Sequence, residues 1–219
     1  MRLLFLHGWG LDASLWDGVR AALPEFETMA WDRGYFGPAS AAPVEGPVLA
    51  VGHSLGAMLL AGISGLVAVN GFDRFAGEDA VPLRVVERMR RRFGEAPAEV
   101  LADFRARIGA GRAPERIDAN RLAADLEILA NTSSPRRKPG AMGGDAVSSS
   151  GGPYPWVPAF AGTTERVLVL HGGADPLLPA PMRDAVFAGA PRETLAEGGH
   201  LLPLTHPEWV AARIRAFAA

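Results

Sequence analysis

The chain has no cysteine, no long apolar run and no excess of positive charge, and each absence excludes a class of protein. Without cysteine there is no disulfide bond, no thiolate catalysis and no thiolate metal site. No apolar run approaches the roughly 20 residues that span a bilayer. Met1-Arg2 also leads directly into the first predicted strand, so we expect a cytoplasmic protein without membrane contact. The net charge of −2 and the lack of a motif mixing aromatic and basic residues argue against nucleic acid as a partner.

What the chain does contain is enough apolar material for one globular core. It has 219 residues, of which 48% are hydrophobic, and this is typical of a single domain. Short apolar runs alternate with segments of helical periodicity. The predicted strands are residues 3–6, 28–31, 48–51, 66–69, 167–170 and 193–195, and the predicted helices are 13–23, 55–64, 179–187 and 207–217. This alternation predicts an α/β fold, with a mostly parallel sheet covered by helices on both faces.

Between residues 83 and 130 the strand-like runs stop, and apolar residues recur at helical spacing. We therefore predict a helical cap at 83–130, inserted into a core formed by 1–82 and 165–219. From 84 to 121, ten arginines stand against six acidic residues, so the cap is basic although the whole chain is acidic. Such a surface either attracts an acidic partner or is an ordinary solvated helix face.

The most informative motif is Gly-His-Ser-Leu-Gly at residues 52–56, between an apolar strand and a helix. A strand that enters a helix through Gly-x-Ser-x-Gly forms a nucleophile elbow, in which the glycines allow a tight turn that exposes the serine hydroxyl. Ser54 is therefore a candidate covalent nucleophile. Glycine-rich turns also serve as plain connectors, so this interpretation depends on finding partners for the serine.

A serine nucleophile needs a base that takes its proton and a third group that orients the base. Of the five histidines, His7 and His171 end predicted strands, His53 lies within the elbow and His206 precedes the last predicted helix. His200 differs because it follows two glycines in a late loop, which can aim its imidazole at the elbow. We therefore predict that His200 is the base.

The predicted orienting group is Asp175, in the loop after the predicted strand 167–170. Sites of parallel sheets gather at the carboxyl ends of the strands, and this loop starts there. Alone, Asp175 could equally be a turn aspartate before proline. However, Ser54, Asp175 and His200 follow the Ser, acid, His order that accompanies a nucleophile elbow. We therefore predict that these three residues form a catalytic triad that needs no metal and no cofactor.

Acyl transfer also requires backbone N–H groups that stabilise the charge on the carbonyl oxygen. In elbow enzymes one donor is the residue after the nucleophile, and the other lies in a loop after an early strand. These positions are Leu55 and Trp9, the latter within His-Gly-Trp-Gly, although a simple glycine-rich turn would look the same. The side chain of Trp9 can also form a wall of an acyl pocket.

Together these motifs resemble the α/β-hydrolase superfamily and, within it, most closely the pimeloyl-[acyl-carrier protein] methyl ester esterases of biotin synthesis. The superfamily as a whole shares the elbow, whereas His-Gly-Trp-Gly-Leu at 7–11 followed by Trp16 is more selective. The resemblance implies hydrolysis of the methyl ester of a carrier-bound pimeloyl chain, and of short-chain esters, through an acyl-enzyme. The likeness runs through residues 3–11, Trp16, 52–56, 70–75, 175–179 and 199–200.

The resemblance also implies that the cap covers the nucleophile and builds the acyl pocket. On this basis we expect substrate contacts from aromatic and arginine side chains of core and cap, namely Trp9, Phe72, Phe104, Arg116 and Arg121. The implied partner is an acidic acyl-carrier protein. Arg116 and Arg121 stand near the start of the last of three segments of helical spacing in the cap, residues 122–129, where relatives place arginines that contact the carrier.

Two features depart from the relatives. They have two strands before the His-Gly strand, which this chain reaches at residue 2, so we expect a missing sheet edge or a start codon assigned too late. Serine, proline and glycine supply 16 of the 32 residues 133–164, a composition that buries too little apolar surface to fold. We expect a disordered insertion at 131–164, either inert or acting as a lid or partner-binding arm through Trp156 and Phe160. Two other functions stay open: a lactone or small-ester hydrolase of the same fold, and a non-catalytic binding protein.

Overall fold

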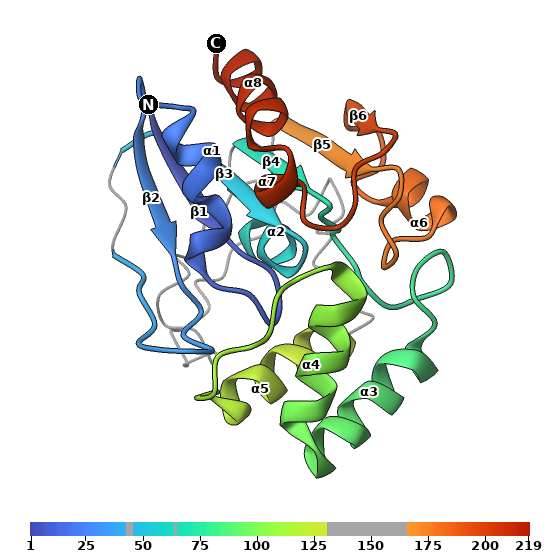
Figure 1. The fold of residues 1–219 in the computed structure, drawn as a ribbon. Helices are drawn as coiled ribbons and strands as arrows, with labels where there is room; N and C mark the ends of the chain where they lie inside the picture. Colours follow the sequence, from blue (N-terminus) through green and yellow to red (C-terminus); the bar gives the residue numbers. More distant parts are fainter. Residues whose placement is uncertain (43–45, 64, 131–165) are drawn as a thin grey trace, which may run out of the picture.

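The computed structural model describes residues 1–42, 46–63, 65–130 and 166–219. Within these ranges six strands form one sheet in the order β2-β1-β3-β4-β5-β6 (Figure 1). Every neighbouring pair is parallel, so the predicted α/β fold is confirmed. The insertion predicted at 131–164 lies outside the described residues. The strands are β1 (Arg2–Leu6), β2 (Glu27–Trp31), β3 (Val48–His53), β4 (Gly65–Val69), β5 (Arg166–Gly172) and β6 (Arg192–Leu195).

The helices follow most of the predicted pattern, but the short helix at 202–205 was not predicted and two predicted helices differ in extent. The predicted helix 13–23 is divided, because Asp12 caps a 3-10 turn before the α-helix starts. The predicted helix 55–64 ends at Leu60, because Ala61 turns to extended backbone and Gly62 has a φ of 112°. The helices are η1 (Ala13–Trp16), α1 (Asp17–Ala21), α2 (Leu55–Leu60), α3 (Leu83–Glu95), α4 (Pro97–Ile108), α5 (Ala119–Ala130), α6 (Ala180–Ala185), α7 (Leu202–Thr205) and α8 (Pro207–Ala218).

Both faces of the sheet are buried, as the unbroken apolar runs of its strands require. Side chains alternate between the two faces of a strand, so β1 divides its residues between two cores. Leu3 and Phe5 pack with apolar side chains of η1, α1, α7 and α8. Leu4 and Leu6 face the other way and pack with α2. The sheet is therefore the middle layer of three.

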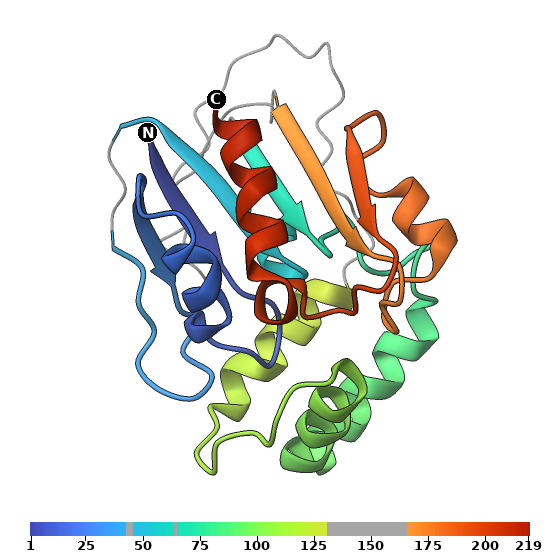
Figure 2. The same ribbon diagram turned by 45° about the horizontal axis from the view of Figure 1, so that its top comes forward.

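The three helices α3, α4 and α5 lie together beyond the carboxyl ends of the strands (Figures 1 and 2). They occupy the segment predicted as a cap. A third core, which includes Trp9 and Phe72, joins this group of helices to the sheet edge. The helices thus lie at the end of the sheet where the loops after the strands converge.

A buried ion pair also ties α5 to the sheet edge. Arg33, in the loop after β2, donates through Nε to Asp125 of α5 over 2.8 Å, and its Nη2 bonds the other carboxylate oxygen. The hydroxyl of Tyr35 donates to the same carboxylate. All three side chains are fully buried. Such a pair resists separation, because removing one partner leaves a buried charge with poorer compensation.

Candidate active site

Ser54 occupies a strained turn between β3 and α2. Its φ of 53° and ψ of −121° are rare for a residue with a side chain, and such strain persists only where the surroundings enforce it. A Cβ at Gly52 would lie 2.4 Å from the Cα of Ala57, and one at Gly56 would lie 2.2 Å from the carbonyl oxygen of Leu6. Only glycine therefore fits on either side of the serine, as the elbow motif predicts.

Asp175 and His200 form a buried hydrogen-bonded pair. The two atoms Asp175 Oδ2 and His200 Nδ1 are 2.7 Å apart, and the side chains are almost completely shielded from solvent. Oδ1 of Asp175 accepts from the backbone N–H groups of Leu177 at 2.7 Å and Leu178 at 3.3 Å. These bonds hold the carboxylate in one orientation, in the loop after β5 where the sequence placed it.

The protonation of this pair follows from its contacts. Burial raises the pKa of Asp175, but the hydrogen bond from His200 and those from Leu177 and Leu178 outweigh burial, so its pKa is lowered. An ionised carboxylate only accepts hydrogen bonds, so Nδ1 of His200 carries the proton. In the neutral ring Nε2 then has a lone pair. Within the described residues this buried nitrogen has no hydrogen-bond partner.

Within the described residues, no hydrogen bond joins Ser54 to this pair. The residue before it, His53, has its ring centroid 4.8 Å from that of His200. The unpartnered Nε2 is the nitrogen that a triad directs at the serine, and such bonds often close only when substrate is bound. The structure thus joins two of the three predicted triad residues directly, and the third directly follows His53, whose ring contacts that of His200.

The two predicted oxyanion donors flank Ser54. Leu55 starts α2, so its N–H is among the first-turn groups without a partner inside the helix. On the other side, a Cβ at Gly8 would lie 2.8 Å from the Cβ of Ser54. The loop that contains Trp9 therefore passes directly against the serine.

His7 controls the orientation of that loop, a role that the sequence did not indicate. Its Nε2 accepts from the backbone N–H of Arg33 at 2.9 Å, so the ring proton is on Nδ1. Nδ1 then donates to the carbonyl oxygen of Gly8 at 2.8 Å. This carbonyl belongs to the peptide group whose other end is the N–H of Trp9, so the imidazole sets the direction in which that N–H points.

The predicted aromatic contacts gather in one apolar region. Trp9 donates through its indole Nε1 to the carbonyl oxygen of Leu122 at 2.9 Å, and its ring meets that of Phe104 edge-on at 4.8 Å. Phe72 is 1% exposed and belongs to the same core as Trp9. The structure therefore brings together Trp9, Phe72 and Phe104 between the elbow region and the helices α3 to α5.

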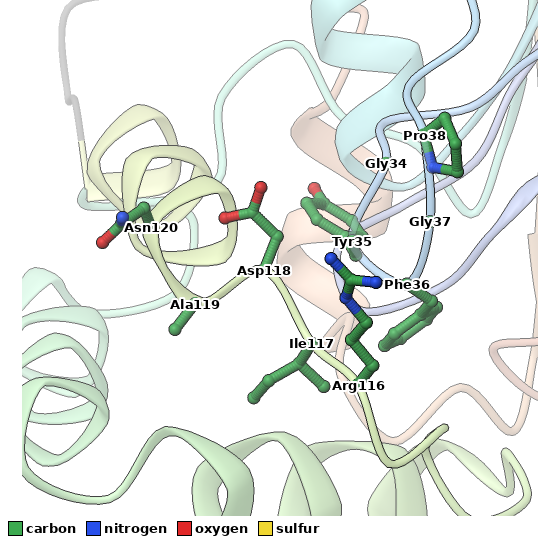
Figure 3. A pocket seen from close by; sticks show the side chains of 10 residues that line it. All are labelled: Gly34, Tyr35, Phe36, Gly37, Pro38, Arg116, Ile117, Asp118, Ala119 and Asn120. Atoms are coloured by element: carbon green, nitrogen blue, oxygen red, sulfur yellow. The ribbon is translucent and has the colours of Figure 1, made fainter.

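The two predicted arginines are placed differently. Arg121 donates to the carbonyl oxygen of Arg33 at 3.0 Å and lies 3.6 Å from the carboxylate of Asp118, so it contributes to attaching α5. Arg116 is exposed and lines a cavity of about 530 Å³ between residues 34–38 and 116–120. Figure 3 shows its side chain extending towards Tyr35 and Phe36. No predicted triad residue lines this cavity.

The described ranges contain no group of three or more His, Cys, Asp or Glu side chains arranged to hold a metal ion. No helix within them is long and apolar enough to cross a membrane.

A parallel sheet whose carboxyl edge carries an elbow serine, beside a late histidine bonded to an acid, defines the class of α/β hydrolases. The chain matches the model of the alpha/beta hydrolase family over residues 3–213. It therefore belongs to that family, as its motifs predicted.

Comparisons with individual proteins agree with this membership. The chain is 26% identical to the pimeloyl-[acyl-carrier protein] methyl ester esterase of Serratia marcescens, over 99% of this chain and 93% of that protein. Its fold is similar to that of a thermophilic esterase from Thermogutta terrifontis, with a TM-score of 0.67, 19% identity and coverage of 100% and 89% of the two chains. It is also similar to an enol-lactonase from Burkholderia xenovorans, with a TM-score of 0.62, 16% identity and coverage of 99% and 91%.

Proposed function

We propose that the protein is a serine carboxylesterase that hydrolyses an acyl ester through an acyl-enzyme. Ser54 Oγ attacks the ester carbonyl while Nε2 of His200 takes its proton, and the backbone N–H groups of Trp9 and Leu55 stabilise the oxyanion. His200 then returns the proton to the leaving alkoxide, which departs as the alcohol. Water, deprotonated by the same nitrogen, attacks the acyl-enzyme and releases the acid and free Ser54. Asp175 keeps the imidazole oriented and stabilises its charged form.

The observation that carries this proposal is the state of His200. Asp175 holds Nδ1 as the protonated nitrogen, and the buried Nε2 is left with a lone pair beside the elbow. A buried polar atom without a partner is uncommon in folded proteins and calls for an explanation. General base catalysis on the Ser54 hydroxyl supplies one.

For the substrate, we propose the methyl ester of a pimeloyl chain carried by acyl-carrier protein. The name of the Serratia marcescens relative supports this choice. The side chains of Trp9, Phe72 and Phe104 pack in one apolar cluster, and we propose that they border the methylene chain of such an acyl group. The exposed arginines of α3 supply positive charge for an acidic carrier, and they include Arg84, Arg88 and Arg91.

A second candidate is a hydrolase of small soluble esters or lactones. One observation favours it: Arg121, which the resemblance assigned to the carrier, is engaged by the carbonyl oxygen of Arg33 and by Asp118. An arginine held in this way contributes less to a partner surface. Hydrolysis of a small ester needs only the triad, the oxyanion donors and the apolar region.

The nucleophile is tested by Ser54→Ala. The variant removes only a hydroxyl, so we expect it to fold like the parent and to lose hydrolysis of p-nitrophenyl butyrate by at least about 1,000-fold. The parent should also be labelled at residue 54 by a fluorophosphonate probe, as shown by mass spectrometry. A variant that hydrolyses the ester at the parental rate contradicts the proposal, and a well-folded parent that the probe does not label favours the non-catalytic binding protein.

A further inference from the structure

The backbone carbonyl of His200 is held by two side chains from the middle of the sheet. Nδ2 of Asn70, the residue after β4, donates to this oxygen at 2.7 Å. Nε2 of His53, at the end of β3, contacts the same oxygen at 2.8 Å. Both side chains are fully buried. The catalytic loop is thus anchored to two neighbouring strands that are more than 120 residues away in sequence.

Asn70 uses its whole amide group in this arrangement. Besides His200, Nδ2 donates to the carbonyl oxygen of Gly199 at 2.9 Å, and Oδ1 accepts from the backbone N–H of Gly172 at 2.7 Å. The residue has a φ of 44°, a conformation that asparagine tolerates better than most residues. One side chain therefore links the loop of His200 with the end of β5, from which the Asp175 loop departs.

His53 completes the arrangement as a neutral donor. Burial, followed by the nearby His200, lowers the pKa of His53 to about 3. The ring is therefore uncharged at neutral pH, and since a carbonyl oxygen only accepts, its proton is on Nε2. His53 directly precedes Ser54, so this hydrogen bond couples the elbow to the backbone of the base.

We propose that Asn70 and His53 are positioning residues that hold the His200 backbone so that its imidazole reaches both Asp175 and Ser54. The inference rests on the proposed function, in which His200 is the base. His200 follows Gly198 and Gly199, and glycine gives the backbone wide freedom. Two donors on the carbonyl remove that freedom. A displacement of about 1 Å at a catalytic group can lower the rate about 100-fold.

The test substitution is Asn70→Asp. Aspartate has the same shape, tolerates the positive φ and keeps an oxygen for the N–H of Gly172, but as an ionised carboxylate it donates to neither Gly199 nor His200. We expect kcat for p-nitrophenyl butyrate to fall about 100-fold with KM little changed, at temperatures well below thermal unfolding of the variant. The matched control is Asn120→Asp, the same change at an exposed residue of α5, which should leave kcat unchanged.

His53 provides a second pair of variants. Gln retains an N–H donor at a position close to Nε2, whereas Leu retains only the bulk. We expect His53→Leu to lower kcat and His53→Gln to restore part of it. A residue that merely supports the fold would instead change the unfolding temperature and leave kcat of the folded protein intact.

A measurement without turnover separates this inference from the proposed function. The proton shared by His200 Nδ1 and Asp175 should give a slowly exchanging downfield proton NMR signal in the parent that is lost in Asn70→Asp. If the parent shows no ester hydrolysis, the proposed function fails, and loss of the signal still supports the positioning role. If Asn70→Asp retains the parental kcat or the parental signal, the inference is overturned.

Discussion

At the residue scale, the histidines show how the surroundings give one side chain different roles. His200 is bonded to an ionised carboxylate, and His7 is held between two backbone groups. Burial, followed by the nearby Arg183 and Arg192, lowers the pKa of His171 to about 4. His171 is thus neutral in the folded protein well below the ordinary histidine pKa of 6.5.

The buried His171 makes stability depend on pH. As pH falls below 6.5 the unfolded chain binds a proton at this side chain before the folded protein does, so the free energy of unfolding decreases down to about pH 4. We expect His171→Leu to make this decrease shallower, by up to about 1.4 kcal/mol per pH unit. Urea unfolding between pH 7 and 4 measures the difference. Parallel curves for parent and variant would contradict the expectation.

At the scale of elements, α5 is attached to the sheet edge by polar contacts as well as by its apolar face. Asp125 accepts from Arg33 and Tyr35, and the carbonyl oxygen of Leu122 accepts from the indole of Trp9. The position of this helix is thus coupled to that of the loop carrying a proposed oxyanion donor.

The buried pair predicts a large effect on stability. Asp125→Ala leaves Arg33 in the core without this carboxylate, so we expect a loss of about 3–5 kcal/mol in the free energy of unfolding. The control on the same helix is Glu127→Ala, which breaks a partly exposed pair with Arg90 and should cost less than about 1 kcal/mol. Urea unfolding followed by tryptophan fluorescence compares the two. Equal losses would show that the buried pair contributes no more to the free energy of unfolding than the exposed pair.

At the scale of the whole molecule, charge is distributed unevenly. The chain carries a net charge of −2, but residues 84–121 have four more arginines than acidic residues. An acidic carrier protein would therefore be attracted to the end of the molecule that holds the proposed catalytic residues.

This asymmetry predicts that a charge reversal on α3 changes the hydrolysis of a carrier-bound ester but not that of a small ester. We expect the double variant R88E/R91E on α3 to lower kcat/KM for a pimeloyl-carrier methyl ester by about tenfold or more, and to leave p-nitrophenyl butyrate hydrolysis unchanged. The control R166E reverses a charge at the first residue of β5, at the end of the sheet away from α3 to α5 (Figure 1). Mass spectrometry of the released acid measures the carrier reaction. Unchanged hydrolysis of the carrier ester in R88E/R91E would favour the hydrolase of small esters.

Much of the fold could be predicted because its signals are local. The apolar runs of β1, β3 and β5 are buried on both faces of the sheet, so they appear in the sequence as strands whatever their neighbours are. The elbow was recognisable because Gly52 and Gly56 are required by close backbone contacts at fixed positions. In contrast, the division of the predicted helix 13–23 depends on the cap that Asp12 forms. The hydrophobic periodicity of this segment does not indicate that division.

By itself the sequence determined the order of strands and helices along the chain and the elbow at Ser54, because each depends on residues near one another in the chain. The Ser, acid, His order of the motifs indicated Asp175 and His200 as partners. Only the tertiary structure decided that Asn70 and His53 bind the carbonyl of His200, and that Arg33 pairs with Asp125. Those contacts join residues 92 to 147 positions apart. No local pattern encodes them, since they exist only once the sheet has brought its strand ends to one edge.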